Sequence, residues 1–212
     1  RFDASRIDAD MVRRFDINGP RYTSYPTADR FVEAFGADSH RRWLAQRNIG
    51  GIETPLSLYV HVPFCRRLCW FCACRTQGTV SDAPVVAYAL MLHQEIALLK
   101  QHLPKGVRLS RLHWGGGTPT MLSPEAMRDL AAAIFAVAPL AEGGEFSVEI
   151  DPMEIDAARL DALVAAGMNR ASIGVQDFDD EIQQAIGRIV TSLISKALCI
   201  LQRPNQRLIV GM

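Results

Sequence analysis

Apolar positions recur with two different periods along the middle of the chain, and these periods predict its elements. Residues 55–62 alternate apolar with polar side chains and end at Pro63, which predicts a β-strand. Residues 82–103 carry apolar side chains at helical spacing, with Pro84 in the first turn, which predicts a long α-helix. A strand followed by a helix is the repeating unit of parallel sheets.

The same unit recurs three more times. We expect further strands over residues 107–114, 146–150 and 170–175, and further helices over residues 124–137, 155–166 and 179–187. Four successive β-α units argue for parallel strands with helices outside, as a barrel or a doubly wound sheet. The predicted fold class is therefore α/β.

Both ends of the chain depart from this pattern. Residues 1–54 are expected to form an N-terminal arm with short helices, including an extended stretch before Pro26, because a residue that precedes proline favours extended backbone. Residues 189–212 are expected to form a divergent tail, helical until Pro204. The edge of the fourth strand would need cover, and the tail could supply it.

Composition narrows the class of protein. The 212 residues are 49% hydrophobic, which suits a globular domain with a core of its own. Lys and Arg together number 23, and so do Asp and Glu, so the formal net charge is zero. No excess of positive charge therefore indicates nucleic acid or an anionic membrane as a partner. No apolar run approaches the ~20 residues of a membrane span. Clustered cysteines without a secretory signal predict a cytoplasmic location, and the start at Arg1 predicts a fragment.

Four of the five cysteines lie within ten residues. Cys65, Cys69 and Cys72 are spaced C-x3-C-x2-C directly after the first strand, and Cys74 follows. Three thiolates on a short loop can hold three irons of a four-iron cluster and leave the fourth iron open to a ligand. Zinc is the alternative, although zinc sites usually add a distant second pair, and only Cys199 remains elsewhere.

Other residues carry weaker signals on their own. Gly115, Gly116 and Gly117 stand between a strand and a helix, where glycine lets backbone approach a ligand, but most such turns are only turns. Glu149 lies in an apolar strand and needs a partner, for which a ligand hydroxyl or ammonium group is suitable. Tyr59 could equally be a core residue, and His61 and His113 are interpreted as hydrogen-bonded histidines rather than catalysts.

Five motifs in a fixed order resemble one family. They are RYTSYPT (residues 21–27), YVHVPFCRRLCWFCAC (59–74), HWGGGTPT (113–120), SVEIDP (147–152) and GVQDF (174–178). The cysteine spacing resembles that of radical S-adenosylmethionine enzymes. The full set resembles the oxygen-independent coproporphyrinogen III oxidases, also called coproporphyrinogen dehydrogenases, from about residue 19 to about residue 188. A related heme chaperone resembles the cysteine and glycine motifs but lacks Cys74 and the RYTSYPT arm.

The resemblance implies a fold and a set of ligands. Residues 55–188 would be part of a (β/α)6 radical-SAM barrel, with four of its six strands present. The three cysteines Cys65, Cys69 and Cys72 would bind a [4Fe-4S] cluster, with Cys74 adjacent but not a ligand. Two molecules of S-adenosyl-L-methionine would bind beside it. The residues implied in cofactor binding are Tyr59, Phe71, Gly116 and Glu149 around the cluster and first molecule, and Gly117, Thr118, Gln176 and Arg188 at the second.

The resemblance also implies a reaction. A 5′-deoxyadenosyl radical would start the oxidative decarboxylation of two propionate side chains of coproporphyrinogen III, giving protoporphyrinogen IX in heme synthesis without oxygen. An external electron donor and acceptor would take part, and the chain is expected to be a monomer. We expect this 212-residue chain not to turn over, because its pocket would be incomplete. A heme-binding chaperone and a small zinc-binding structural protein are the alternatives, which metal analysis and heme binding would distinguish.

Overall fold

The computed structural model describes residues 9–15, 30–46, 56–70, 72, 74–187 and 207–211. The chain divides into two compact units, Arg1–His40 and Arg41–Met212. Helix α1 (Ala9–Phe15) lies in the first unit, and helix α2 (Ala37–Ala45) begins there. Both agree with the short helices expected near the N-terminus, whereas the arm at residues 21–27 lies outside the described residues. The domain boundaries after residues 54 and 188 stay predictions.

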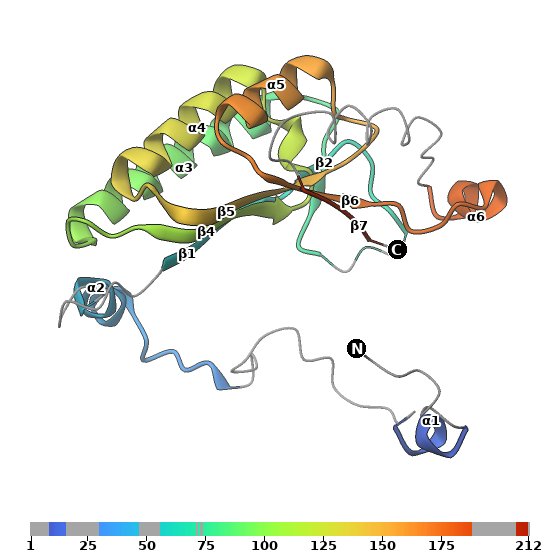
Figure 1. Cartoon of the computed structure of the whole chain (residues 1–212), viewed down its shortest axis with the longest axis horizontal. Helices are drawn as coiled ribbons and strands as arrows, with labels where there is room; N and C mark the ends of the chain where they lie inside the picture. The colour runs from blue at the N-terminus through green and yellow to red at the C-terminus, as the bar shows by residue number, and fades with distance from the viewer. Residues whose placement is uncertain are drawn as a thin grey trace. The chain divides into compact units, whose positions relative to one another are not determined.

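The second unit is built on a parallel five-stranded sheet (Figure 1). Its strands, in spatial order, are β1 (Leu56–Val62), β4 (Leu109–Gly116), β5 (Leu140–Ile150), β6 (Arg170–Gly174) and β7 (Arg207–Gly211). Every neighbouring pair is parallel. The α/β class and the four predicted strands are therefore confirmed, and β5 begins six residues earlier than its apolar alternation indicated.

The fifth strand corrects the expectation of four strands. Strand β7 comes from the tail and pairs with β6 from Arg170↔Arg207 to Gly174↔Gly211. The tail thus covers the edge of β6, where unpaired N–H and C=O groups would otherwise face outward. The helix expected over residues 190–201 lies outside the described residues.

Three helices cover one face of the sheet (Figure 1): α3 (Ala83–His102), α4 (Pro124–Val137) and α5 (Ala157–Ala165). The Ser123 hydroxyl accepts a hydrogen bond from the Ala126 amide at 3.1 Å and so caps α4, and Asp156 caps α5 in the same way. A short helix α6 (Asp180–Ala185) follows β6. Among the described residues, no helix is both long and apolar enough to cross a membrane.

Alternation along the strands separates an apolar face from a polar face. Trp114, Phe146 and Val148 are fully buried on the helix-covered side. The rings of Trp114 and Phe146 pack edge to face there, with 5.2 Å between their centroids. Full burial of such side chains stabilises the fold by about 1.5–3 kcal/mol each. Because successive side chains of a strand point to opposite faces, His113 and Glu149 lie on the other side.

A two-stranded ladder closes the base of the cysteine loop. Strand β2 (Phe64–Cys65) pairs with β3 (Gln77–Gly78), and the Thr79 amide donates to the Cys65 carbonyl at 2.9 Å. Strand β1 leads directly into this ladder. The loop therefore begins and ends at fixed points beside the carboxyl ends of the sheet strands, where parallel α/β folds build their sites.

Candidate functional site

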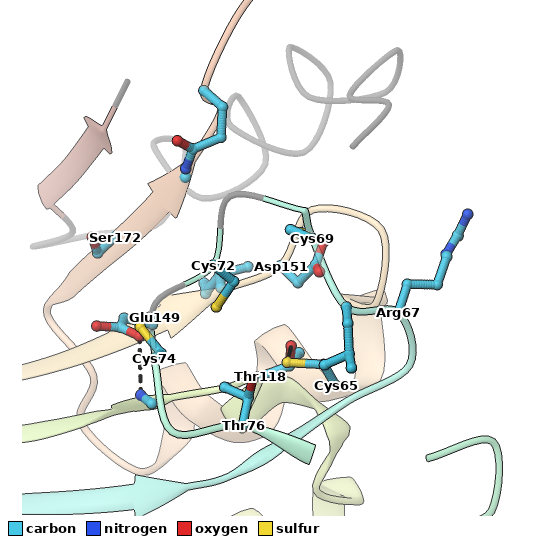
Figure 2. Close-up of a pocket in the computed structure, with 16 residues that line it drawn as sticks. Cys65, Arg67, Cys69, Cys72, Cys74, Thr76, Thr118, Glu149, Asp151 and Ser172 are labelled. Carbon is cyan, nitrogen blue, oxygen red and sulfur yellow. Dashed lines mark hydrogen bonds between the residues drawn. The ribbon is translucent and has the colours of Figure 1, made fainter. Parts of the chain in front are cut away.

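One pocket of about 280 Å³ lies between the cysteine loop and the carboxyl ends of β4, β5 and β6 (Figure 2). Its lining residues are Cys65, Arg67, Leu68, Cys69, Cys72, Cys74, Thr76, Gly116, Gly117, Thr118, Glu149, Ile150, Asp151, Ser172, Gly174 and Gln176. Three strands, the cysteine loop and the segments that follow β5 and β6 thus contribute to a single cavity.

All four clustered cysteines line this pocket. Cys65 ends strand β2 and is half-buried, whereas Cys72 and Cys74 are exposed. The Cys72 amide donates to the Cys69 carbonyl at 3.1 Å, which forms a tight turn between those two positions. Among the described residues, no three His, Cys, Asp or Glu side chains are gathered closely enough to hold a metal ion. The sulfurs therefore share a cavity without forming a preassembled ligand set.

Burial raises the pKa of the Cys65 thiol. The Thr118 hydroxyl, 3.5 Å from the Cys65 sulfur, lowers this pKa, while the negative charges of Cys72, Cys69 and Asp151 raise it again. Figure 2 shows Cys65 beside Thr118, with Cys72 and Cys74 on the other limb of the loop. The thiol nearest the core is thus held in its protonated form more strongly than an ordinary cysteine.

Arg66 ties the cysteine loop to two other elements. Its guanidinium pairs with Asp82 at the N-terminus of α3, and its Nε lies 3.8 Å from a carboxylate oxygen of Glu154. Glu154 belongs to the loop that follows β5 and also carries Asp151. Arg66 therefore links both loops that wall the pocket.

The end of β4 and the residue that follows it can accept only glycine. Gly116 has φ +107°, and a Cβ there would lie 2.5 Å from the His61 ring. A Cβ on Gly117 would lie 2.6 Å from the Phe64 carbonyl oxygen. The Gly117 amide donates to the Val62 carbonyl at 2.8 Å. Bare backbone at this turn brings β4 against the base of the cysteine loop and leaves room for a ligand above it.

Glu149 projects from β5 into the same pocket. One carboxylate oxygen lies 3.2 Å from His113 Nε2, and the other accepts from the Gly116 amide at 3.1 Å, one of the hydrogen bonds drawn in Figure 2. Burial raises the pKa of Glu149, but the hydrogen bond and charge of His113 and the Gly116 amide outweigh it, so the net pKa is lowered. Glu149 is thus an ionised carboxylate at the cavity wall, and the partners that the structure gives it are His113 and the Gly116 amide; a ligand partner stays a prediction.

Tyr59 is connected to this carboxylate but does not line the pocket. Its ring stacks on the His113 ring, with 5.6 Å between the ring centroids and an interplanar angle of 13°. Its hydroxyl lies 3.1 Å from His61 Nδ1, and His61 Nε2 lies 3.0 Å from the Arg75 carbonyl. Because a carbonyl only accepts, Nε2 donates to it and Nδ1 accepts from Tyr59. Burial and the Glu149 charge raise the pKa of Tyr59 to about 12.

The pocket brings together most of the predicted site residues. It contains the predicted cluster ligands Cys65, Cys69 and Cys72, the adjacent Cys74, and the predicted cofactor residues Gly116, Gly117, Thr118, Glu149 and Gln176. Phe71 and Arg188 lie outside the described residues. The role of each residue toward a ligand stays a prediction.

Sequence reasoning assigned no role to the lining residues Arg67, Leu68, Thr76 and Ile150, nor to three lining residues in or beside β5 and β6. These three are Asp151, two positions after Glu149, and Ser172 and Gly174, which precede Gln176 by four and two positions. Side chains two apart on a strand share a face, so this period of two was the signal that could have found them. Gln176 also adopts φ +74°, an unusual backbone conformation for a residue other than glycine.

Comparison with known proteins agrees with this arrangement. Residues 59–198 match the family model of the radical SAM superfamily. The chain is 64% identical over 174 residues to an oxygen-independent coproporphyrinogen III oxidase of Paracoccus denitrificans, covering 82% of this chain and 38% of that protein. It is 42% identical over 191 residues to the protein of the same name from Pseudomonas aeruginosa, covering 89% and 41%.

A solved structure shows the same fold. The coproporphyrinogen III oxidase HemN from Escherichia coli, described as a radical SAM enzyme, superposes with a TM-score of 0.75 at 41% identity, covering 84% of this chain and 40% of that one. The chain thus spans about two fifths of the length of the relatives it matches. The match supports an α/β fold with a parallel sheet of the radical SAM type for this chain.

The pocket suits the groups that this superfamily implies, a [4Fe-4S] cluster and S-adenosylmethionine. Thiolates are the ligands of iron–sulfur clusters, and four thiols line one cavity here. The two positions at which a Cβ would collide with the His61 ring or the Phe64 backbone, Gly116 and Gly117, border the same cavity. From the cysteine loop, the parallel sheet and the matched model together, the chain belongs to the radical SAM superfamily.

Proposed function

We propose that this chain is the cluster- and cofactor-binding part of an oxygen-independent coproporphyrinogen III oxidase. One observation carries the proposal: the thiols of Cys65, Cys69 and Cys72 share a cavity with the glycine turn and the Glu149 carboxylate. Its relatives at 42% and 64% identity are named oxygen-independent coproporphyrinogen III oxidases, which supports coproporphyrinogen III as the substrate.

Three thiolates, from Cys65, Cys69 and Cys72, would hold the cluster, while Cys74 stands beside it. We assign a first S-adenosylmethionine to the side of Gly116 and Glu149, where the ionised carboxylate can accept hydrogen bonds from a ribose or an ammonium group. A second molecule is assigned to the side of Gly117, Thr118 and Gln176, which border the same cavity. Tyr59 would support the first position through His113 rather than from the lining itself.

When bound, the cluster and S-adenosylmethionine supply a carbon radical that can remove hydrogen from an unactivated carbon. The protein's own part is to position the reactants and to exclude water. For each propionate, a hydrogen atom would pass from the carbon next to the ring to this radical, the carboxylate would leave as carbon dioxide, and one electron would pass to an external acceptor. The product of two such steps is protoporphyrinogen IX.

The described residues contain the pocket in which this reaction would start. Strands β1 and β7 are the outer strands of the described sheet, so the barrel is not closed within the described residues. We therefore propose that the chain binds cofactor but does not complete the decarboxylation alone. A monomer in a reducing cytoplasm is the state we propose, because the pocket depends on free thiols.

Anaerobic reconstitution with iron and sulfide tests the metal assignment. We expect about four irons and four sulfides per chain, as the cluster type requires. Cys69→Ser should lose most of this iron, whereas the matched control Cys74→Ser should keep it. Stoichiometric zinc that persists under these conditions, with no bound sulfide, would contradict the proposal.

Turnover assays test the substrate and the limits of the chain. With a strong reductant, the reconstituted chain should bind S-adenosylmethionine. It should form no protoporphyrinogen from coproporphyrinogen III, whereas a chain extended to the length of its relatives should form it. Tight heme binding without decarboxylation by the extended chain would instead favour the chaperone function.

A further inference from the structure

The two oxygens of Glu149 are held by two groups of strand β4. His113 Nε2 lies 3.2 Å from one oxygen, and the Gly116 amide donates to the other at 3.1 Å. An ionised carboxylate can only accept, so His113 must carry its hydrogen on Nε2 and donate. The carboxylate therefore has a defined rotation, and Glu149 lines the pocket in this position.

Gly115 lies directly under this hydrogen-bonded pair. A Cβ at this position would lie 2.9 Å from the Glu149 carboxyl carbon and 2.9 Å from His113 Nε2. The φ of Gly115 lies outside the left-handed region, so backbone conformation does not require glycine there. Space favours it, because a Cβ at residue 115 would force the Glu149 carboxyl group or the His113 ring to move from its present position.

The ring of His113 is held in turn by Tyr59. The two rings are nearly parallel, at 13°, with centroids 5.6 Å apart. The Tyr59 hydroxyl is hydrogen-bonded to His61 Nδ1. His61 Nε2 in turn donates to the carbonyl of Arg75, near the end of the cysteine loop. A continuous set of contacts therefore runs from the cysteine loop to Glu149.

We propose that His113 is a positioning residue that aims the Glu149 carboxylate into the cofactor pocket, and that Gly115 is required to leave space for this pair. The inference rests on the proposed function, in which Glu149 contacts S-adenosylmethionine. His113 itself touches Glu149 and Tyr59 and does not line the pocket. Its loss should weaken cofactor binding while the cysteines still hold their cluster.

Equilibrium dialysis of S-adenosylmethionine against the reconstituted chain, with iron analysis of each sample, tests this separation. His113→Phe keeps the ring that stacks on Tyr59 and removes the donor. We expect it to weaken binding by about 10- to 100-fold, the effect of losing a hydrogen bond to a charged group, with iron content unchanged. His113→Gln, whose amide nitrogen can occupy the place of Nε2, should recover most of the affinity. His102→Phe, at the end of α3, is the matched control and should bind like the parent.

Two further variants sharpen the result. Gly115→Ala should weaken binding as His113→Phe does, since it displaces the same pair. In a Glu149→Ala background, His113→Phe should cause little additional loss, because the two residues act as one unit. Unchanged affinity in His113→Phe, or a loss of iron that parallels the loss of affinity and is not rescued by His113→Gln, would overturn the inference.

A ligand-independent measurement separates this inference from the proposed function. If the parent chain binds no S-adenosylmethionine, the proposed function fails, and ¹⁵N NMR of labelled histidine then decides the role of the pair. The parent should show His113 in the Nε2-protonated tautomer, and Glu149→Ala should shift this residue toward a mixture of tautomers. A His113 spectrum that does not respond to Glu149→Ala would show that the pair is not formed.

Discussion

The hydroxyl of Thr118 lies 3.5 Å from the sulfur of Cys65. The backbone amide of Thr118 donates a hydrogen bond of 2.7 Å to the carbonyl of Phe64, the residue before Cys65. The residue that follows the glycine turn is thus attached twice to the residues that begin the cysteine loop. Thr118 itself is buried, which holds its hydroxyl and amide in place for these two bonds. The two most distinctive motifs of the sequence therefore form one structural unit.

Removing the Thr118 hydroxyl should change the chemistry of Cys65. Thr118→Val keeps the shape but removes the hydrogen bond that lowers the pKa of Cys65, so this pKa should rise further. Because the thiolate is the reactive form, alkylation of Cys65 in the metal-free chain should slow at neutral pH, which mass spectrometry of labelled peptides can follow. Thr120→Val is the matched control, since the buried Thr120 hydroxyl has no hydrogen-bond partner among the described residues. Equal rates in the two variants would contradict the prediction.

Gly117→Ala should displace the cysteine loop. Its Cβ would meet backbone atoms, the Phe64 oxygen at 2.6 Å and the Val62 oxygen at 2.9 Å, which cannot rotate away as a side chain can. We expect a loss of about 1–3 kcal/mol in the free energy of unfolding, typical of overpacking, and a lower iron content after reconstitution. The control is Gly36→Ala, where no atom lies within 4 Å of the added Cβ. A stable variant with full iron content would refute this view of the turn.

Breaking the Arg66 link should loosen the cysteine loop. The Arg66 side chain is 25% exposed between Asp82 and Glu154, so Arg66→Ala leaves Glu154, itself only 23% exposed, without this cation. We expect faster protease cleavage within residues 66–76 and a loss of about 1–3 kcal/mol in unfolding free energy. Arg128→Ala removes the exposed pair with Glu125 and should cost no more than about 1 kcal/mol. Indistinguishable digestion of the two variants would count against the link.

Glu149 should make stability depend on pH in the acid range. Its folded-state pKa is lowered from the ordinary value of 4.5, so the folded chain binds this proton less tightly than the unfolded chain. The contribution of Glu149 is therefore complete above pH 4.5 and is lost as the pH falls through the lowered value. The difference in unfolding free energy between the parent and Glu149→Gln should shrink over that interval in urea titrations. A difference that grows on acidification would have the wrong sign.

Tyr59 should ionise at unusually high pH. Its pKa is raised to about 12, so its neutral form stabilises the folded chain below its ordinary pKa of 10.0, and this contribution is lost as the pH rises through 12. The ultraviolet absorbance of tyrosinate, recorded while the chain remains folded, should contain a component near pH 12 that Tyr59→Phe removes. The chain has four tyrosines, and Tyr88, whose pKa is also raised by burial, provides the comparison through Tyr88→Phe.

Local patterns were sufficient to predict the elements and the chemistry of the ligands. The alternation in residues 55–62 predicted β1, and Ser123 before an amphipathic stretch predicted the start of α4, because period and capping depend on near neighbours. The spacing of Cys65, Cys69 and Cys72 likewise predicted a cluster loop without reference to any distant residue. The charge of Glu149 within an apolar strand predicted that it has a partner.

Tertiary structure decided which distant groups meet. Sequence alone did not reveal that the partners of Glu149 include His113, 36 residues away, because this depends on the register between β4 and β5. Nor did it predict that Gly115 leaves the space between them, or that residues 207–211 supply a fifth strand. Pairing and register are set by the combined burial of a whole sheet face, whereas period, caps and ligand spacing are properties of short segments, so the sequence by itself determined the parts of this site and the fold determined their arrangement.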